Sequence, residues 1–231
     1  MSMDFSGATS GRIDCGAGSS VNSLAPLTVA AWVYPTSLAT GRRIFAKSGG
    51  GVAVNFGMDG GTSSRLNLFV DYGTTDLQAI SASSVLSANT WQFVAGVDGG
   101  AGVAPKLFHG TRTSAVAEVS SYTTQTTPAG SRGNDGSNVL YVGNQGTFNT
   151  AWPGWIFWIG LYNEALSVGQ LRRLQMHPRM TASCRFFMYP GLQGTGAQPD
   201  WSGQKNNGTL GGTTALARHA PIPWPMVRSV A

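Results

Sequence analysis

Short runs of alternating apolar, β-branched and aromatic residues recur along the chain, and clusters of turn-forming residues separate them. Glycine, serine, asparagine and aspartate make up these clusters, as in Met58–Gly61 and Asp98–Gly100. Runs of this length and spacing are typical of strands in an antiparallel sandwich or jelly roll. We therefore expect strands at Leu27–Val33, Gly51–Phe56, Leu66–Tyr72, Trp91–Val97, Lys106–His109, Val139–Val142 and Ile156–Tyr162.

The remaining segments predict one helix, one long loop and one C-terminal arm. Ser167 can cap a short helix that ends near Met176, before His177-Pro178. The polar stretch Ser120–Ser137 is typical of a long exposed loop. A length of 231 residues suits one β-sandwich domain, which we place at 1–215. Prolines in 216–231 cannot continue a strand ladder, and this segment is expected to be an extended arm.

Charge and apolar patterning exclude several classes of partner. Charged residues make up 11% of the chain, and the arginines behind the net charge of +5 are scattered, which argues against a nucleic-acid surface. No run approaches the ~18 apolar residues of a spanning helix, and no signal peptide opens the chain, so we expect no membrane partner. Cys15 and Cys184 are either two buried thiols or one bridge.

Four segments, taken in order, resemble motifs of the concanavalin A-like, laminin-G-like jelly-roll superfamily. They cover about 165 residues and fall in the family's order: Asp4–Gly7 through Ile13-Asp14, Leu27–Pro35, Trp91–Val97, and Leu140–Asn144 followed by Gly154–Ile156 and Leu161–Ser167. The resemblance implies an all-β antiparallel sandwich with one short helix.

The C-terminal part also resembles this family, in segments that precede the opening strand in many relatives: Tyr189–Leu192, Asp200–Gly203 and Asn206–Leu210. Circular permutation is tolerated where chain ends lie close together. We therefore expect residues 185–215 to complete the sheet that residues 3–15 begin, with Cys15 near Cys184.

The residues for catalysis are missing, so we expect no enzyme activity. Glycosidases of this fold need closely spaced acids, and neither Glu118 nor Glu164 has an acidic residue within four positions. The three histidines lack metal-ligand spacing, and no cofactor is expected. Some laminin-G-like domains bind calcium, for which Asp200 and Asn206 are candidates, although turn formation explains them better.

Glycan binding is the function that the resemblance implies most directly. Aromatic rings stack on the apolar faces of sugars, while Asn and Asp bind the hydroxyls. A platform of this kind is predicted from Trp152, Trp155, Asn144 and Asn149, with Tyr34 and Tyr122 as further rings. Core packing, platform and partner contact remain open alternatives for Trp152 and Trp155.

The segment 152–162, WPGWIFWIGLY, is apolar on both faces of its expected strand. Relatives carry polar residues where this chain has Phe157, Trp158 and Gly160. Exposed aromatic area of this size promotes aggregation, so the strand must be covered. Either the helix and the C-terminal segment cover it, or another subunit does.

We interpret low charge, a proline-rich arm and missing catalytic residues as signs of an assembly subunit. The chain is similar in fold and context to capsid-decoration or tail-associated virion proteins of tailed bacteriophages. This hypothesis predicts a non-catalytic attachment protein that contacts itself or capsid or tail proteins through Trp155, Phe157 and Trp158 and through Pro221, Pro223 and Trp224. Its expected location is the virion or the infected host's cytoplasm. The alternative is a lectin-like module that binds cell-surface glycans.

Overall fold

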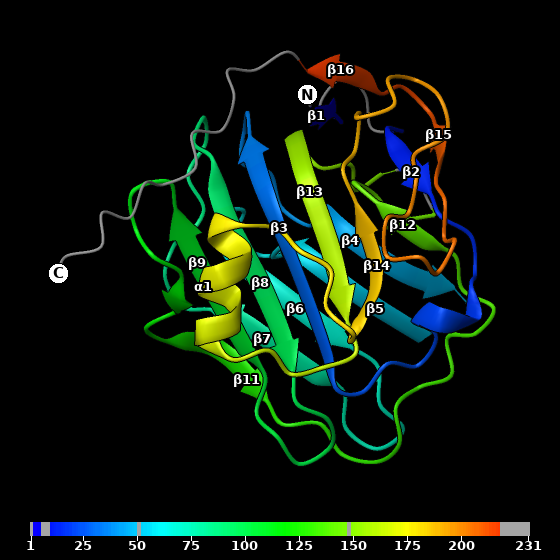
Figure 1. Ribbon diagram of the computed structural model, residues 1–231. Helices are drawn as coiled ribbons and strands as arrows, with labels where there is room; N and C mark the ends of the chain where they lie inside the picture. The colour runs from blue at the N-terminus through cyan, green and yellow to red at the C-terminus, as the bar shows by residue number, and fades with distance from the viewer. Residues whose placement is uncertain (1, 6–9, 50–51, 147–148, 218–231) are drawn as a thin grey trace, which may run out of the picture.

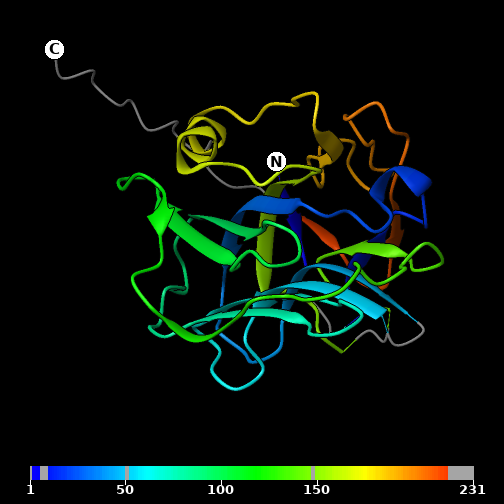
Figure 2. The same cartoon turned by 90° about the horizontal axis from the view of Figure 1, so that it is seen from below.

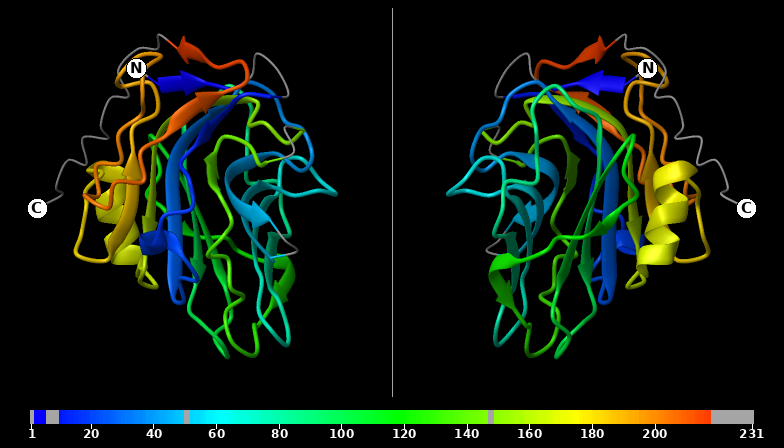
Figure 3. Two further views of the ribbon diagram at one scale, coloured as in Figure 1. Left: turned by 90° about the vertical axis from the view of Figure 1, so that its right-hand side faces the viewer. Right: turned by 90° about the vertical axis from the view of Figure 1, so that its left-hand side faces the viewer.

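The computed structural model is an antiparallel β-sandwich of two eight-stranded sheets with one α-helix on its outer side (Figure 1). It describes residues 2–5, 10–49, 52–146 and 149–217. Figures 2 and 3 show three layers, in which the helix lies on one sheet and the second sheet lies beyond it. The expected all-β fold with one helix is therefore confirmed.

The first sheet has the strand order β10-β9-β8-β3-β13-β1-β16, with β14 also paired to β13. Its strands are β1 (Ser2–Asp4), β3 (Leu27–Pro35), β8 (Gln92–Asp98), β9 (Lys106–Thr111), β10 (Ala117–Glu118), β13 (Gly154–Tyr162), β14 (Cys184–Met188) and β16 (Ala215–Ala217). The longest ladder joins β3 and β13, from Gly154 opposite Pro35 to Tyr162 opposite Thr28.

The second sheet has the order β11-β7-β6-β5-β4-β12-β2-β15. Its strands are β2 (Arg12–Asp14), β4 (Arg43–Gly49), β5 (Val52–Met58), β6 (Leu66–Val70), β7 (Leu77–Ser81), β11 (Tyr122–Thr126), β12 (Leu140–Val142) and β15 (Thr209–Gly211). A short 3-10 helix, η1 (Ser19–Val21), follows β2. All strand pairs in both sheets are antiparallel, which is why short turns can connect so many of them.

The main core lies between the two sheets and is built from alternate residues of the strands. Phe56 and Leu68, which face each other on β5 and β6, are both 0% exposed. Gly96 of β8 leaves room for them, because a Cβ at this position would lie 3.0 Å from the Phe56 ring and 3.1 Å from Leu68. Alternation of this kind buries one face of each strand and fixes its register.

A second core covers the outer face of the first sheet under the helix α1 (Val168–Met176). Ser167 caps α1 in a capping box with Gln170, as expected from the sequence. Leu171 and Leu174 of α1 are buried against the sheet. The indole N–H of Trp32 donates to the carbonyl oxygen of Gln175 (3.0 Å), which ties the end of α1 to β3.

The apolar strand β13 is covered largely from within the molecule. A β-bulge between Ile156 and Trp158 interrupts its alternation, so that Ile156 belongs to the core between the sheets and Trp158 to the outer core. The Trp158 ring stacks on Phe187 of β14, with centroids 5.5 Å apart and planes at 22°. Trp158 is 0% exposed, so this part of the strand is covered by the helix and the C-terminal segment and not by another subunit.

The C-terminal strands close both sheets beside the N-terminal ones, as the permuted arrangement predicts. Leu210 of β15 pairs with Ile13 of β2, and Leu216 of β16 pairs with Met3 of β1. Figure 1 shows the red and orange strands next to the blue ones at this edge. Strand β15 therefore completes the second sheet as expected for residues 185–215. The expectation that no strand ladder extends past residue 215 is wrong for the first residues of the predicted arm, because Leu216 and Ala217 pair with β1 ahead of the prolines.

The prediction of one long exposed loop at Ser120–Ser137 is wrong. Residues Tyr122–Thr126 form β11, which pairs with β7 at the edge of the second sheet. Asp135 is only 1% exposed, and its carboxylate forms ion pairs with Lys47 (2.9 Å) and Arg132 (2.8 Å). The stretch lacks apolar alternation because β11 lies at a sheet edge and the buried Asp135 is held by ion pairs.

Both cysteines are free thiols, each 3% exposed, so the bridge is not formed. Burial raises the pKa of Cys15 well above its usual value, with smaller contributions from the negative charges of Asp14 and Asp200. Burial also raises the pKa of Cys184 to about 12. Because the thiolate is the reactive form, we expect both cysteines to be inert in the native protein.

We expect a thiol reagent such as DTNB at pH 8 to leave native Cys15 and Cys184 unmodified over minutes. In denaturant without reductant, the same reagent should modify both cysteines. Fast labelling of the native protein would contradict their burial. Absence of labelling in denaturant would indicate a disulfide.

No helix in the described ranges is long and apolar enough to cross a bilayer.

Candidate functional site

Three aromatic residues stand side by side across neighbouring strands on the outer face of the first sheet. Trp155 of β13 is in register with Tyr34 of β3. Their rings stack with centroids 4.5 Å apart and planes at 13°. Trp91, immediately before β8, lies 5.4 Å from the Tyr34 ring and 6.2 Å from the Trp155 ring. Cross-strand neighbours at this spacing form a continuous row of side chains.

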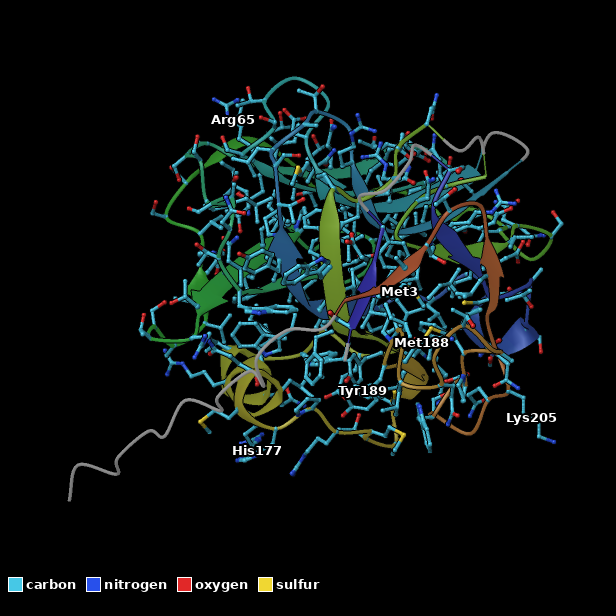
Figure 4. The ribbon with its side chains drawn as sticks, turned by 90° about the horizontal axis from the view of Figure 1, so that it is seen from above. Met3, Arg65, His177, Met188, Tyr189 and Lys205 are labelled. Carbon is cyan, nitrogen blue, oxygen red and sulfur yellow. The ribbon has the colours of Figure 1, made fainter. Side chains whose placement is uncertain are left out.

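Two further rings extend this row toward β14. Phe157 sits at the bulge of β13, with its ring centroid 6.4 Å from that of Trp91 and 5.7 Å from that of Tyr189. Figure 4 shows Tyr189 beside Met188, on the side of the sheet that carries α1. We call the surface formed by Tyr34, Trp91, Trp155, Phe157 and Tyr189 the aromatic face.

The aromatic face is a surface and not a core, although it rests on one. Tyr34, Trp155, Phe157 and Tyr189 are partly exposed and pack against the outer core, whereas Trp91 is 7% exposed. Burial raises the pKa of Tyr189, so its hydroxyl keeps its proton at neutral pH. The face therefore combines rigid apolar rings with polar atoms at their tips, which suits the binding of a ligand that has both apolar and hydroxyl groups.

The structure separates the residues predicted for this site. Trp155 and Phe157 do lie together on the surface, but Trp158 is 0% exposed, so it cannot contact a partner as predicted. Trp152 is also 0% exposed and belongs to the core between the sheets, where it cannot stack on a sugar. Both corrections arise because these indoles fill the two cores.

The predicted asparagines lie away from the aromatic face. Asn144, just after β12 of the second sheet, is 0% exposed, and its side-chain oxygen accepts hydrogen bonds from Gln145 and Thr150. It shapes a turn, so its prediction as a sugar ligand is wrong. Asn149 is exposed in the same turn, where its backbone oxygen accepts from Arg42 (3.0 Å). Trp155 therefore shares no site with these two residues.

Other predicted residues lie elsewhere or outside the described ranges. The Tyr122 hydroxyl, at the edge of the second sheet, donates to Glu118 (3.1 Å) and accepts from the backbone N–H of Leu107 (2.9 Å). The predicted contacts Pro221, Pro223 and Trp224 lie outside the described residues.

The carboxylate of Asp200 holds a turn, and its surroundings do not fit a calcium site. It accepts hydrogen bonds from the backbone N–H groups of Phe187 (3.0 Å), Ser202 (2.9 Å) and Asn206 (3.0 Å). The Asn206 side chain donates to it as well (3.0 Å). Calcium requires six to eight oxygen ligands. In the described part of the chain, no three His, Cys, Asp or Glu side chains gather as a metal-ligand set.

The two glutamates are far apart and engaged in other contacts. Glu118 is on β10 and pairs with Lys106 (3.1 Å), while Glu164 follows β13 and accepts from Gln170 (2.7 Å). Three strands separate β10 from β13 in the sheet, a distance of about 19 Å at ~4.8 Å per strand. Glycosidase acid pairs are roughly 5–9.5 Å apart. These two residues therefore cannot act as such a pair.

Sequence reasoning missed Tyr189 as a member of the aromatic face, because Tyr189 was considered only as part of the motif Tyr189–Leu192. Trp91 was not predicted for the site either, and at 7% exposed it belongs to the outer core. Pairing of Tyr34 with Trp155 follows from the β3–β13 register, which no short-range pattern reveals. Tyr189 reaches the face only because β14 pairs with β13.

Two packed antiparallel sheets with this strand order place the chain in the jelly-roll class of β-sandwich proteins. A family model described as the concanavalin A-like lectin/glucanases superfamily matches residues 7–172. The chain belongs to this superfamily.

Solved structures share the fold at low sequence identity. A Bacteroides ovatus protein described as carbohydrate-binding has a TM-score of 0.63 and 13% identity, with 92% of this chain and 58% of that chain covered. The present chain thus spans little more than half of that protein. A Limulus polyphemus SAP-like pentraxin has a TM-score of 0.47 and 14% identity, with 75% and 80% of the two chains covered.

Domains LG4-5 of the mouse laminin α1 chain have a TM-score of 0.49 and 14% identity, with 72% of this chain and 42% of that chain covered. A search of curated protein sequences gave no match.

Proposed function

We propose that the protein is a non-catalytic carbohydrate-binding module whose ligand docks on the aromatic face. One observation carries the proposal: four partly exposed aromatic residues, from β3, from β13 and from the residue after β14, lie in one contiguous group around the buried Trp91. Membership of a superfamily that includes lectins, and a fold shared with a protein described as carbohydrate-binding, support the proposal.

The geometry suits a sugar chain more than a single sugar. Tyr34 and Trp155 stack on each other, so a ligand can contact the edges of these two rings. The neighbouring rings extend this contact area along the sheet. A fully covered aromatic side chain buries about 150–250 Å², and the four partly exposed rings retain part of that area for a ligand. A row of rings can thus follow several sugar units, with the Tyr34 and Tyr189 hydroxyls available to donate hydrogen bonds to sugar oxygens.

We expect Trp155→Ala to weaken glycan binding at least tenfold while the protein stays folded. Trp155 is partly exposed and packs on the outer core from the beginning of β13, so its loss removes contact area while the fully buried side chains stay in place. A glycan array should identify the strongest neutral ligand, and titration calorimetry should then compare the variants. Trp201→Ala is the matched control, because Trp201 is 42% exposed and outside the aromatic face. Equal affinity of both variants would contradict the assignment of the site.

A protein partner is the second candidate for the aromatic face. Trp155 and Phe157, two residues predicted for docking, lie side by side on the surface, and an apolar surface of this type also suits protein contacts. The partner would then be a second copy or a capsid or tail protein of a virion. Light scattering over a range of concentrations tests self-association, and a concentration-dependent mass that Phe157→Ser abolishes would favour this candidate.

A further inference from the structure

A pocket of about 120 Å³ lies between α1 and the segment that follows it. This volume is well above the ~10–15 Å³ that a single water molecule requires. The pocket is lined by Leu166, Gln170, Arg173, Leu174, Arg179 and Thr181. It opens on the same side of the first sheet as the aromatic face, and Figure 4 shows His177 of this region on the side of the molecule opposite Arg65.

The fold holds both walls of the pocket in place. Gln170, Arg173 and Leu174 have the spacing that puts side chains on one side of a helix. The opposite wall is fixed by the Tyr162 hydroxyl, which donates to the carbonyl oxygen of Arg179 (3.2 Å). Since Tyr162 is 0% exposed in the outer core, the segment that carries Arg179 is anchored to the sheet.

The pocket carries an excess of positive charge. Arg173 and Arg179 have no carboxylate within ion-pair distance in the described structure, where the three ion pairs involve Lys47, Lys106 and Arg132. Neither guanidinium group of the pocket makes a hydrogen bond to another described residue.

The other charged groups near the pocket do not cancel this excess. Glu164 is the neighbouring acid, and hydrogen bonds from Ser183 and Gln170 lower its pKa, so it stays ionised as a single negative charge. The remaining arginines of this region are engaged with backbone carbonyls: Arg172 donates to Val116 (3.3 Å) and Arg185 donates to Ala182 (3.1 Å). The two pocket arginines, Arg173 and Arg179, therefore outnumber the single carboxylate of Glu164, which already accepts from Gln170 (2.7 Å).

We propose that the pocket binds the anionic group, a carboxylate or a sulfate, of an acidic sugar. Arginine presents planar donors that match either anion in a bidentate manner. Leu166 and Leu174 add apolar contacts for a sugar ring, and Gln170 and Thr181 add polar ones. The inference rests on the proposed function, because it specifies acidic units in the glycan that the aromatic face binds.

The two sites are spaced for one chain of sugars. Trp155 lies near the beginning of β13 and Tyr162, next to the pocket wall, at its end. Seven residues of strand extend over about 23 Å at ~3.3 Å per residue. An oligosaccharide of several units can cover this distance along the outer side of the first sheet.

The test compares acidic and neutral oligosaccharides of matched length on the full chain. The probes are a uronic-acid oligosaccharide, a sulfated oligosaccharide, a neutral oligosaccharide and inorganic sulfate. We expect one of the acidic probes to bind at least tenfold more tightly than the neutral one at low salt, with affinity that falls as salt rises. The stronger of the two acidic probes then identifies the anionic group.

The double variant Arg173→Ala/Arg179→Ala should abolish this preference and leave affinity for the neutral probe unchanged. Arg65→Ala is the control for loss of positive charge, since Arg65 lies on the opposite side of the molecule (Figure 4). Circular dichroism checks that all variants are folded, and both pocket arginines are exposed, so folding should be retained.

The outcomes separate the two proposals. Neutral glycans that bind through Trp155, without a preference for acidic probes or with a preference that the double variant keeps, would overturn the inference and leave the proposed function standing. Binding of inorganic sulfate without binding of any glycan would overturn both. Absence of glycan binding in every arm would likewise overturn the proposed function and the inference with it.

Discussion

Replacing Trp158 with glutamate is expected to unfold the protein. Trp158 is 0% exposed, stacks on Phe187 and packs 5.9 Å from the Phe93 ring. Truncating a buried tryptophan costs about 3–5 kcal/mol, and an unpaired buried carboxylate adds several kcal/mol. Because whole domains are stable by only about 5–15 kcal/mol, the sum approaches the entire stability. Circular dichroism and urea unfolding of Trp158→Glu should show a largely unfolded chain.

Trp158→Phe is the control for this experiment. It keeps an aromatic ring over Phe187 and removes an indole N–H that has no hydrogen-bond partner in the described structure. Trp158→Phe should lower the free energy of unfolding by several kcal/mol less than Trp158→Glu does, because it buries no charge. A Trp158→Glu variant that folds normally and only loses an assembly contact would mean that the ring is exposed in solution.

Removal of the Asp135 carboxylate should destabilise the second sheet almost as strongly. Its two oxygens pair with Lys47 and Arg132, and one of them also accepts the backbone N–H of Ser23 (2.7 Å). Asp135→Ala leaves two cations buried without a counter-charge. Breaking a buried pair in this way costs about 3–5 kcal/mol. Chemical unfolding at pH 7 measures the loss directly.

The pH dependence of Asp135→Ala provides an independent check. Burial already lowers the pKa of Lys47, and the hydrogen bond and charge of Asp135 oppose that shift. Without Asp135 the folded-state pKa falls further below the unfolded value of about 10.4. The unfolded chain then binds more protons between these two values, so stability of the variant should rise with pH across that window. A flat profile would contradict the burial of Lys47.

Lys47→Met is the matched variant for the same cluster. It removes one cation while Arg132 continues to pair with Asp135 at 2.8 Å. Methionine fills a similar volume among the apolar neighbours Phe45 and Val54, which line the same small cavity. This variant should therefore be less destabilised than Asp135→Ala, since no charge is left unpaired.

The residue patterns within short segments, namely apolar runs and a helix cap, were sufficient to predict the fold. The runs at Leu27–Val33 and Leu66–Tyr72 became β3 and β6, and Ser167 caps α1 as expected. These features depend on residues close together in sequence. The strand at Tyr122–Thr126 was missed because it lies at a sheet edge and its side chains are polar or partly exposed, so it lacks apolar alternation.

The site was harder to predict, because it depends on geometry that is not periodic. Strict alternation along β13 places Phe157 and Trp158 on opposite faces, but the bulge puts both on the outer side. Only the packing of α1 and β14 then decides that Trp158 is covered and Phe157 is not. Likewise, the residue composition around Asn144 does not show whether its turn is buried or exposed, so the burial of Asn144 could not be predicted.

The placement of the last strands also bears on how the chain acquires its fold during synthesis. The Asn206 side chain donates to Ser20, 186 positions earlier. At about 5–20 residues per second, a ribosome needs roughly 10–40 s to make that stretch. Until then β1 and β2 lack their partners β16 and β15. Until β16 and β15 are made, the free edges of β1 and β2 must be kept from pairing with other chains, which makes chaperone protection most valuable late in translation.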